Sequence, residues 1–139
     1  MSRVLSLAAL LGLALILNWL KPGAGAGEME FLPASRICVI DGDTIAQGKD
    51  RYRLKGFDTP ETRNARCESE RARGYAAKER LLEIVRQNGG LDLVLDSRRD
   101  KYGRFLAEAY AGGLPVRDFL ITEGLARPYA GGKRKSWCR

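Results

Sequence analysis

Histidine is absent from the 139 residues of the sequence. This absence removes the commonest general base and the commonest transition-metal ligand, and it excludes every Ser/His and Cys/His catalytic pair. A metal site in this chain would have to use oxygen ligands, which favours calcium or magnesium over zinc. Acid–base chemistry must likewise fall to other groups.

Negative charge is in the minority, with 17 Asp and Glu residues against 24 Lys and Arg residues and a formal net charge of +7. A basic surface with local acidic clusters suits a polyanionic substrate and a bound cation, although the charge alone is explained as well by solubility. The length allows one domain with its own hydrophobic core and is too short for two once the N-terminal segment is discounted.

Long apolar runs are scarce, and the longest covers residues 4–20. The basic Arg3 precedes this run, and the small residues Ala24-Gly25-Ala26 follow it, which is the pattern of an export signal cleaved near Ala26. A retained membrane anchor is the alternative, because the run reaches the lower end of a bilayer span. Both interpretations predict a secreted or periplasmic folded part. We assign residues 1–26 to this segment, 27–35 to a linker and 36–139 to one domain.

Cysteine is also scarce, and three residues allow at most one intramolecular disulfide. Cys67 and Cys138 lie in polar, loop-like contexts and are predicted to pair. Cys38 lies in the apolar run 37–40, where we expect its thiol to pack as a small hydrophobic group. Free thiols or an intermolecular bridge remain the alternative, because spacing does not establish pairing.

Alternating apolar residues and turn signals predict five strands, and helical spacing predicts two helices. Their order indicates an α+β, mainly β fold: a five-stranded OB-fold barrel with a helix between strands 3 and 4 and a short helix after strand 5. The predicted strands cover residues 37–40, 44–46, 51–57, 91–95 and 105–111; the first helix covers 74–87, and the second begins after Pro115 and ends at Gly124.

Carboxylates follow two of the predicted strands. Asp43 lies just past the corner that leaves the first strand, and Asp58 and Glu61 lie just past the third. Adjacent strand ends can bring these groups together, and the backbone carbonyl of Thr59 would add another hard oxygen ligand. Glu61 is then a candidate base beside the cation.

Two arginines accompany these carboxylates. Arg53 is five residues before Asp58, an odd offset that would point the two to opposite faces of an ideal strand, although the turn at Gly56 can reset the alternation. Arg104 begins the fifth strand after Gly103 and can offer a bidentate fork to phosphate. Each residue alone is explained by a turn, a cap or solvated surface. Together they indicate metal-dependent phosphodiester chemistry.

Several short strings, in this order, resemble the staphylococcal-nuclease-like (thermonuclease) family over about residues 36–127. The resemblance implies an OB-fold and a calcium-dependent endonuclease that cuts DNA and RNA to products with a 3′-phosphate. The strings are Ile40-Asp41-Gly42-Asp43-Thr44-Ile45, Tyr52-Arg53-Leu54, Asp58-Thr59-Pro60-Glu61, Asp100-Lys101-Tyr102-Gly103-Arg104 and Glu123-Gly124-Leu125-Ala126.

The resemblance also implies roles for individual residues. The calcium ligands fall on Asp43, Asp58 and the Thr59 carbonyl. The glutamate that acts on the attacking water falls on Glu61, and the two phosphate-binding arginines fall on Arg53 and Arg104. Lys101 and Tyr102 match positions that contact the terminal phosphate of the nucleotide.

The chain departs from the family pattern near its end, where the long final helix is missing and Tyr129 is the only nearby candidate for a stacking tyrosine. The predicted disulfide could tie down the segment that this helix would otherwise hold. The segment 131–135, which carries three basic residues before Trp137, is explained as a solvated chain end. A role in which it faces the substrate is the alternative.

Two other functions compete with the nuclease: a non-catalytic nucleic-acid-binding module on the same barrel, and an envelope protein that uses the barrel for protein contacts. The retained acidic and arginine positions favour the nuclease. We therefore expect DNA or RNA as the substrate, no protein partner and a monomer.

Overall fold

The computed structural model describes residues 27–138. The predicted export signal or anchor at residues 1–26 lies outside the described residues. Within the described range, no helix combines the length and the apolar character needed to cross a membrane.

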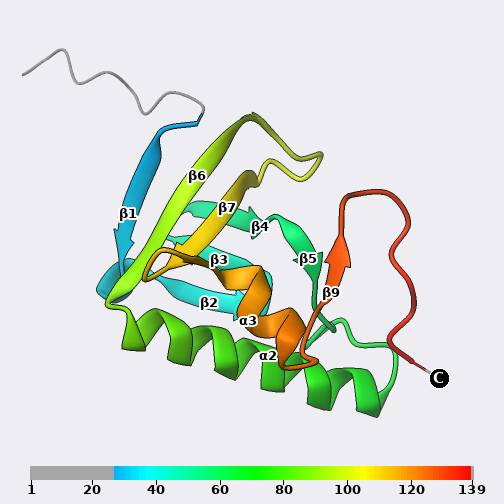
Figure 1. Cartoon of the computed structure of the whole chain (residues 1–139). Coiled ribbons are helices and arrows are strands. Elements are labelled where there is room, and N and C mark those ends of the chain that lie inside the picture. The colour runs from blue at the N-terminus through cyan, green and yellow to red at the C-terminus, as the bar shows by residue number, and fades with distance from the viewer. Residues whose placement is uncertain (1–26, 139) are drawn as a thin grey trace, which may run out of the picture.

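One curved sheet forms the body of the fold, with strands in the order β1-β6-β7-β4-β3-β2 and β8 paired to β7 (Figure 1). Neighbouring strands are antiparallel except β4 and β7, which are parallel. This mainly β architecture, with two α-helices among residues 27–138, confirms the expected α+β, OB-type fold. The bounds of its strands are β1 Met29–Pro33, β2 Cys38–Asp41, β3 Thr44–Gln47, β4 Asp50–Leu54, β6 Gly90–Arg99, β7 Phe105–Ala111 and β8 Leu114–Pro115; the short 3-10 helix η1 covers Ala34–Arg36.

The structure has more strands than the sequence predicted, and two of them, β5 and β9, form a separate two-stranded sheet. Residues 29–33, assigned above to a linker, form β1, which pairs along its whole length with β6 and buries Leu32. The predicted strand 51–57 is divided at Lys55 into β4 and a separate strand, β5 (Gly56–Asp58). β5 pairs with β9 (Arg127–Tyr129), which was not predicted.

The main helix α2 (Glu68–Gln87) begins at Glu68 and not at Gly74 as predicted. Its first turns carry mostly charged residues, which show no apolar repeat, and Glu68 and Glu70 suit the positive end of the helix dipole. The apolar repeat becomes visible only where the helix meets the core. The second helix, α3 (Val116–Thr122), begins after Pro115 as predicted.

The core lies between the curved sheet and the two helices, and Figure 1 shows α2 running along one end of the barrel with α3 beside it. Cys38 is the unpaired cysteine, as expected, but its thiol is exposed and does not pack in the core. It alternates with the buried Val39 on β2 and therefore points outward. The largest buried apolar side chains are Leu32, Ile45, Leu54, Phe57, Leu81, Ile84, Leu91, Leu93, Val85, Val116 and Leu120.

Candidate active site

The break between β4 and β5 brings the side chains of Arg53 and Asp58 close together. Gly56 has a φ of 89°, a conformation that L side chains rarely adopt, so the chain turns between the two strands. Arg53 Nη2 consequently lies 3.8 Å from Asp58 Oδ1. The odd spacing that argued against convergence is reset by this glycine.

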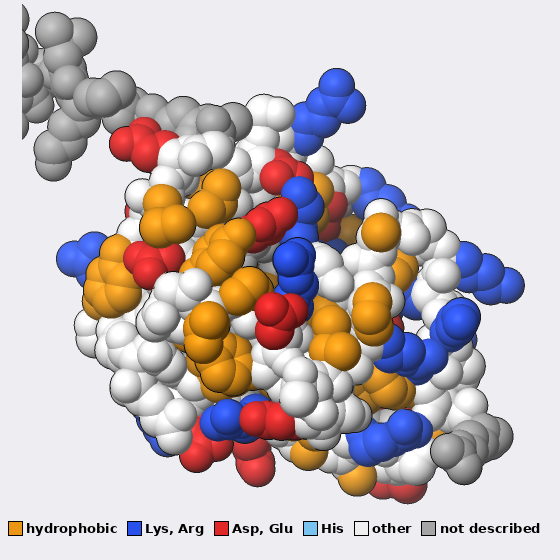
Figure 2. Space-filling view, viewed as in Figure 1, with side chains coloured by type: hydrophobic (Ala, Val, Ile, Leu, Met, Phe, Trp, Pro, Cys, Tyr) orange, Lys and Arg blue, Asp and Glu red, His pale blue; other side chains and the backbone are white. Residues whose placement is uncertain are grey.

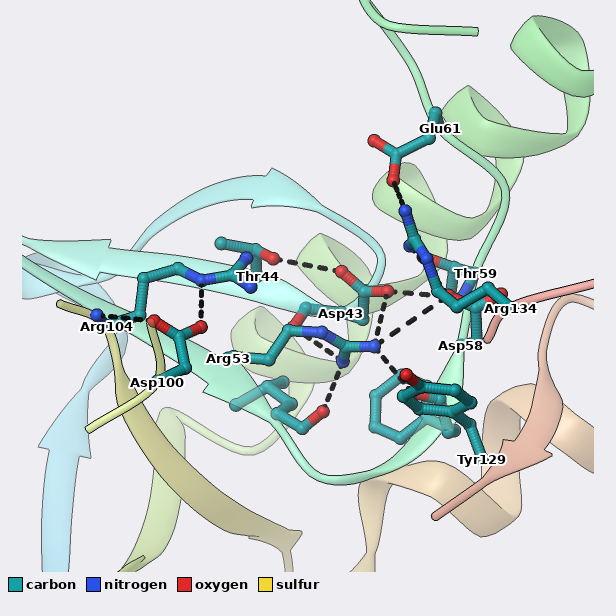
Figure 3. A network of polar contacts seen from close by, with 12 residues as sticks. Asp43, Thr44, Arg53, Asp58, Thr59, Glu61, Asp100, Arg104, Tyr129 and Arg134 are labelled. Atoms are coloured by element: carbon teal, nitrogen blue, oxygen red, sulfur yellow. Dashed lines mark hydrogen bonds and ion pairs between the residues drawn. The ribbon is translucent and has the colours of Figure 1, made fainter. Parts of the chain in front are cut away.

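The guanidinium of Arg53 is buried and held by the backbone on both sides of the break (Figure 3). Its Nη1 donates to the carbonyl of Leu54, and its Nη2 donates to the carbonyl of Phe57 at 3.0 Å. The same Nη2 lies 3.3 Å from Asp43 Oδ2. Arg53 is therefore fixed between two carboxylates, Asp43 and Asp58.

Asp43 is positioned by the tight corner between β2 and β3. Thr44 Oγ1 donates to Asp43 Oδ1 at 2.9 Å, and the backbone N–H of Thr59 donates to Asp43 Oδ2 at 3.2 Å. A Cβ at Gly42 would lie 2.8 Å from side-chain carbons of Ala77 and Thr59, so only glycine lets this corner pack against α2 and the loop after β5. The hydroxyl of Thr59 is buried and has no hydrogen-bond partner in the described part of the chain.

Asp58 and Glu61 are both contacted by the C-terminal segment. Arg134 Nη1 lies 2.8 Å from Asp58 Oδ1, and Arg134 Nη2 lies 2.8 Å from Glu61 Oε1. Trp137 Nε1 donates to Asp58 Oδ2 at 3.0 Å. Burial alone would lower the pKa of Arg134, but the hydrogen bonds from its guanidinium to Glu61 and Asp58 outweigh burial and raise that pKa above its usual value.

A disulfide between Cys67 and Cys138 ties the C-terminal segment to the start of α2. Figure 1 shows this segment passing from β9 back to that end of the helix. In Figure 2, lysine and arginine side chains gather on the side of the molecule where this segment lies. Residues 131–138 are therefore neither a free solvated end nor a remote tail.

Arg104 is oriented by the loop between β6 and β7. Its Nε lies 2.6 Å from Asp100 Oδ2, and its backbone N–H and that of Tyr102 each donate to Asp100 Oδ1 at 2.9 Å. Burial would raise the pKa of Asp100, but these hydrogen bonds from Arg104 and Tyr102 hold it below its usual value. Tyr102 is exposed, and the Nζ of Lys101 lies 5.1 Å from the centre of its ring.

Most of the predicted site residues line one cleft of about 800 Å³. Asp58 instead lines an adjoining pocket of about 240 Å³, and Glu61 and Arg134 border both spaces. The side chain of Thr59 lines neither. The predicted residues in the larger cleft are Asp43, Arg53, Glu61, Lys101, Tyr102 and Arg104.

Two residues of the site, Arg134 and Trp137, were not assigned from the sequence. Arg134 follows Lys133 in a short basic run, and Trp137 stands beside Cys138. The predicted disulfide between Cys67 and Cys138 was the signal that could have found them. Cys67 ends the loop after β5, so a bond to Cys138 brings Arg134 and Trp137, which lie close to Cys138 in the sequence, toward Asp58.

The donor set fits a hard divalent cation. Asp43 and Asp58 are 6% and 4% exposed and lie within 3.8 Å of the same nitrogen of Arg53. The position between Asp58 and Glu61 already attracts a cationic group from Arg134. Carboxylate and carbonyl oxygens are the ligands that calcium and magnesium prefer.

Comparison with known protein families agrees with this geometry. A family model described as staphylococcal nuclease homologue matches residues 51–136, more than half of the chain. The chain belongs to this family. The matched region contains Arg53, Asp58, Glu61 and Arg104, and it extends to the C-terminal segment that carries Arg134.

Relatives of the chain include bacterial and plant nucleases, of which it matches only part. It is 44% identical over 95 residues to "Endonuclease YncB" of Bacillus subtilis (strain 168), covering 64% of this chain and 44% of the relative. It is 38% identical over 93 residues to "Thermonuclease" of Staphylococcus intermedius, covering 64% of this chain and 55% of the relative. It is 31% identical over 94 residues to "Staphylococcal-like nuclease CAN1" of Arabidopsis thaliana, covering 68% of this chain and 26% of the relative.

Proposed function

We propose that the chain is a calcium-dependent endonuclease that hydrolyses phosphodiester bonds in DNA or RNA to products with a 3′-phosphate. One observation carries the proposal: the buried guanidinium of Arg53 lies beside Asp43 and Asp58 and faces a cleft that Arg104 also lines. Family membership and the names of the endonuclease and thermonuclease relatives support it.

Three residues would hold the cation: Asp43 and Asp58 through their carboxylates, and Thr59 through its backbone carbonyl. Bound calcium supplies a Lewis acid that stabilises the charge on a phosphoryl oxygen. Asp43 suits this role because Thr44 and the Thr59 N–H fix its carboxylate before any ligand arrives. Such preorganisation lowers the cost of binding.

Glu61 would take a proton from the water that attacks phosphorus, and the 5′ oxygen would leave in line with the attack. The carboxylate of Glu61 borders both the cleft and the adjoining pocket, so water can reach it from either side. Arg134 occupies one oxygen of this carboxylate, Oε1, at 2.8 Å, so the proton would go to the other oxygen, Oε2.

Arg53 and Arg104 would donate to the phosphoryl oxygens as negative charge builds in the transition state. Asp100 holds Arg104 through Nε, and the two terminal nitrogens of Arg104 have no hydrogen-bond partner among residues 27–138. These nitrogens form a fork that matches two oxygens of a phosphate. Lys101 and the exposed Tyr102, on the same loop, would contact the terminal phosphate.

The compartment and the assembly state are also part of the proposal. We place the folded part outside the cytoplasm, secreted or in a periplasm, with residues 4–20 acting as an export signal or as a membrane attachment. The Cys67–Cys138 bond supports this assignment, because disulfides persist in oxidising compartments. We propose a monomer that needs no protein partner.

Plasmid nicking by the full chain tests the proposal. Calcium should stimulate nicking and a chelator should stop it, because the carboxylates alone provide no Lewis acid. Glu61→Ser should remove nicking, whereas Glu79→Ser, an exposed position on α2, should not. Nicking that continues in chelator, or that survives Glu61→Ser, would show that the site is assigned wrongly.

The second candidate is a non-catalytic nucleic-acid-binding module. The contacts of Arg134 with Asp58 and Glu61 favour it, because they neutralise the two carboxylates that catalysis needs. The same preparation separates the two functions: binding of labelled DNA without any calcium-stimulated cleavage would establish the module.

A further inference from the structure

Trp137 is held in a fixed place by groups on three sides. The guanidinium carbon of Arg127 lies 3.4 Å from the centre of the Trp137 ring, and that of Arg73 lies 5.4 Å from it. Arg73 also donates to the backbone carbonyl of Trp137, and the next residue, Cys138, forms the disulfide to Cys67. An indole stacked against two cations and tethered at the adjacent residue has little freedom to turn.

The indole N–H is aimed at one oxygen of Asp58. Trp137 Nε1 lies 3.0 Å from Asp58 Oδ2, and the indole can only donate, so this oxygen must accept. The other oxygen, Oδ1, lies 2.8 Å from Arg134 and 3.8 Å from Arg53. One oxygen of Asp58 thus accepts from the neutral indole N–H, and the other faces the guanidinium groups of Arg134 and Arg53.

The same indole keeps Arg127 from pairing with Asp58. Arg127 stands opposite Asp58 in the β5–β9 pair, where a direct ion pair between neighbouring strands would be expected. The guanidinium of Arg127 instead stacks on the indole, and its Nη2 donates to the carbonyl of Ser136 at 3.0 Å. Trp137 therefore takes the position beside Asp58 that Arg127 could otherwise fill.

We propose that Trp137 is a positioning residue for the proposed reaction: its N–H fixes the plane of the Asp58 carboxylate and presents Oδ1 to the bound cation. This inference rests on the proposed function. Donors that orient a metal-binding carboxylate change metal affinity when they are lost, typically by ten-fold or more. The Cys67–Cys138 bond keeps the donor in place, so the disulfide also supports the affinity of the site for its cation.

The first test is Trp137→Phe in the full chain, which keeps an aromatic ring between the two arginines and removes the N–H. Calcium affinity measured by calorimetry should fall about ten-fold. The midpoint of thermal unfolding in chelator should stay close to that of the unaltered protein. Cleavage should fall at limiting calcium and recover when calcium is raised, which a loss of packing alone would not produce.

Trp19→Phe, the same change at the other tryptophan, which lies in the predicted export segment, is the matched control in the uncleaved chain and should leave calcium affinity unchanged. It also makes Trp137 the only tryptophan, so fluorescence reports on the indole directly. Calcium should change this emission, and Asp58→Asn should abolish the response. If Trp137→Phe does not fold, the Cys67→Ser/Cys138→Ser variant replaces it and should show the same ten-fold loss of affinity.

A folded Trp137→Phe variant that binds calcium as tightly as the unaltered protein would overturn the inference. Fluorescence of Trp137 that does not change when calcium binds would overturn it as well. Both results leave the nuclease assignment standing, provided that the unaltered protein binds calcium and cleaves. Failure of the unaltered protein to bind or cleave would instead remove the proposed function itself.

Discussion

The guanidinium of Arg134 spans Asp58 and Glu61, with 2.8 Å from its Nη1 to Asp58 Oδ1 and 2.8 Å from its Nη2 to Glu61 Oε1. A cation that uses Asp58 Oδ1 must displace the first of these contacts. Under the proposed function, Arg134 would therefore compete with the metal ion for this oxygen and with water for Glu61.

Replacing Arg134 by glutamine should tighten calcium binding by about five-fold, because each partly exposed ion pair that the cation must break contributes roughly 1 kcal/mol at most. Calorimetry in low salt measures this change. Lys135→Gln removes a neighbouring charge that has no ion pair in the described structure and serves as the control. Weaker calcium binding by Arg134→Gln would show that the guanidinium assists the site and does not compete with the ion.

Lysine at position 53 should reduce turnover at saturating substrate by at least about 100-fold, the cost of losing a preorganised donor to the transition state. Lysine keeps the positive charge but cannot donate to two backbone carbonyls and still reach a phosphate as a planar fork. Arg86→Lys, at an exposed position of α2, is the matched control. Turnover of Arg53→Lys within a few-fold of the unaltered protein would remove Arg53 from the mechanism.

Gly74→Ala should destabilise the fold and displace Glu61. A Cβ at Gly74 would lie 2.2 Å from the carbonyl oxygen of Glu61, a backbone atom that cannot move without moving the loop after β5. We expect urea denaturation to show a loss of about 2 kcal/mol in the free energy of unfolding, although alanine favours the helix by about 1 kcal/mol. In the same helix, Ala76→Gly tests propensity alone at an exposed position and should cost about 1 kcal/mol with nicking retained. A Gly74→Ala protein as stable as the unaltered one would contradict the close packing.

Protonation of Asp100 should release Arg104 as pH falls. The pKa of Asp100 in the folded protein is below its ordinary value of 3.8, so its carboxylate stabilises the fold fully above 3.8 and loses this contribution as pH falls through the folded value. Asp100→Asn should lower the free energy of unfolding by about 1 kcal/mol at pH 7, since the charge-assisted contact with Arg104 is lost. Urea denaturation at a series of pH values should show this difference shrinking below pH 3.8. A difference that stays constant with pH would mean that another group sets the acid response.

The candidate site residues could be placed at strand ends from the sequence because they sit in short strings with their own local signals. Asp43 follows a glycine corner, Asp58 precedes a proline turn and Arg104 follows a glycine, so each could be assigned to a loop at a strand end. That these loops meet was inferred from the barrel topology, and the contacts of Arg53 with both Asp43 and Asp58 show that they do.

Features that depend on contacts between residues far apart in the chain could not be predicted from the sequence. The C-terminal segment that carries Arg134 has no periodicity, and a disulfide and long-range ion pairs place it. The strand β1 was assigned to a linker because it is short and buries one side chain, Leu32, while Met29 and Phe31 are exposed. Such a segment shows no clear alternation of apolar and polar residues. The first turns of α2 were missed because their residues are mostly charged, and the buried Glu70 contacts backbone N–H groups of the loop after β5 and not the apolar core.

The turn at Gly56 brings Arg53 and Asp58 together only for the present number of residues between them. Inserting or deleting one residue between them would reverse the facing of β5, because side chains alternate along a strand. One of the two groups would then turn away from the other, even though every residue of the candidate site was still present. Grafting this site onto another barrel thus requires the spacer to be carried over intact along with the charged residues.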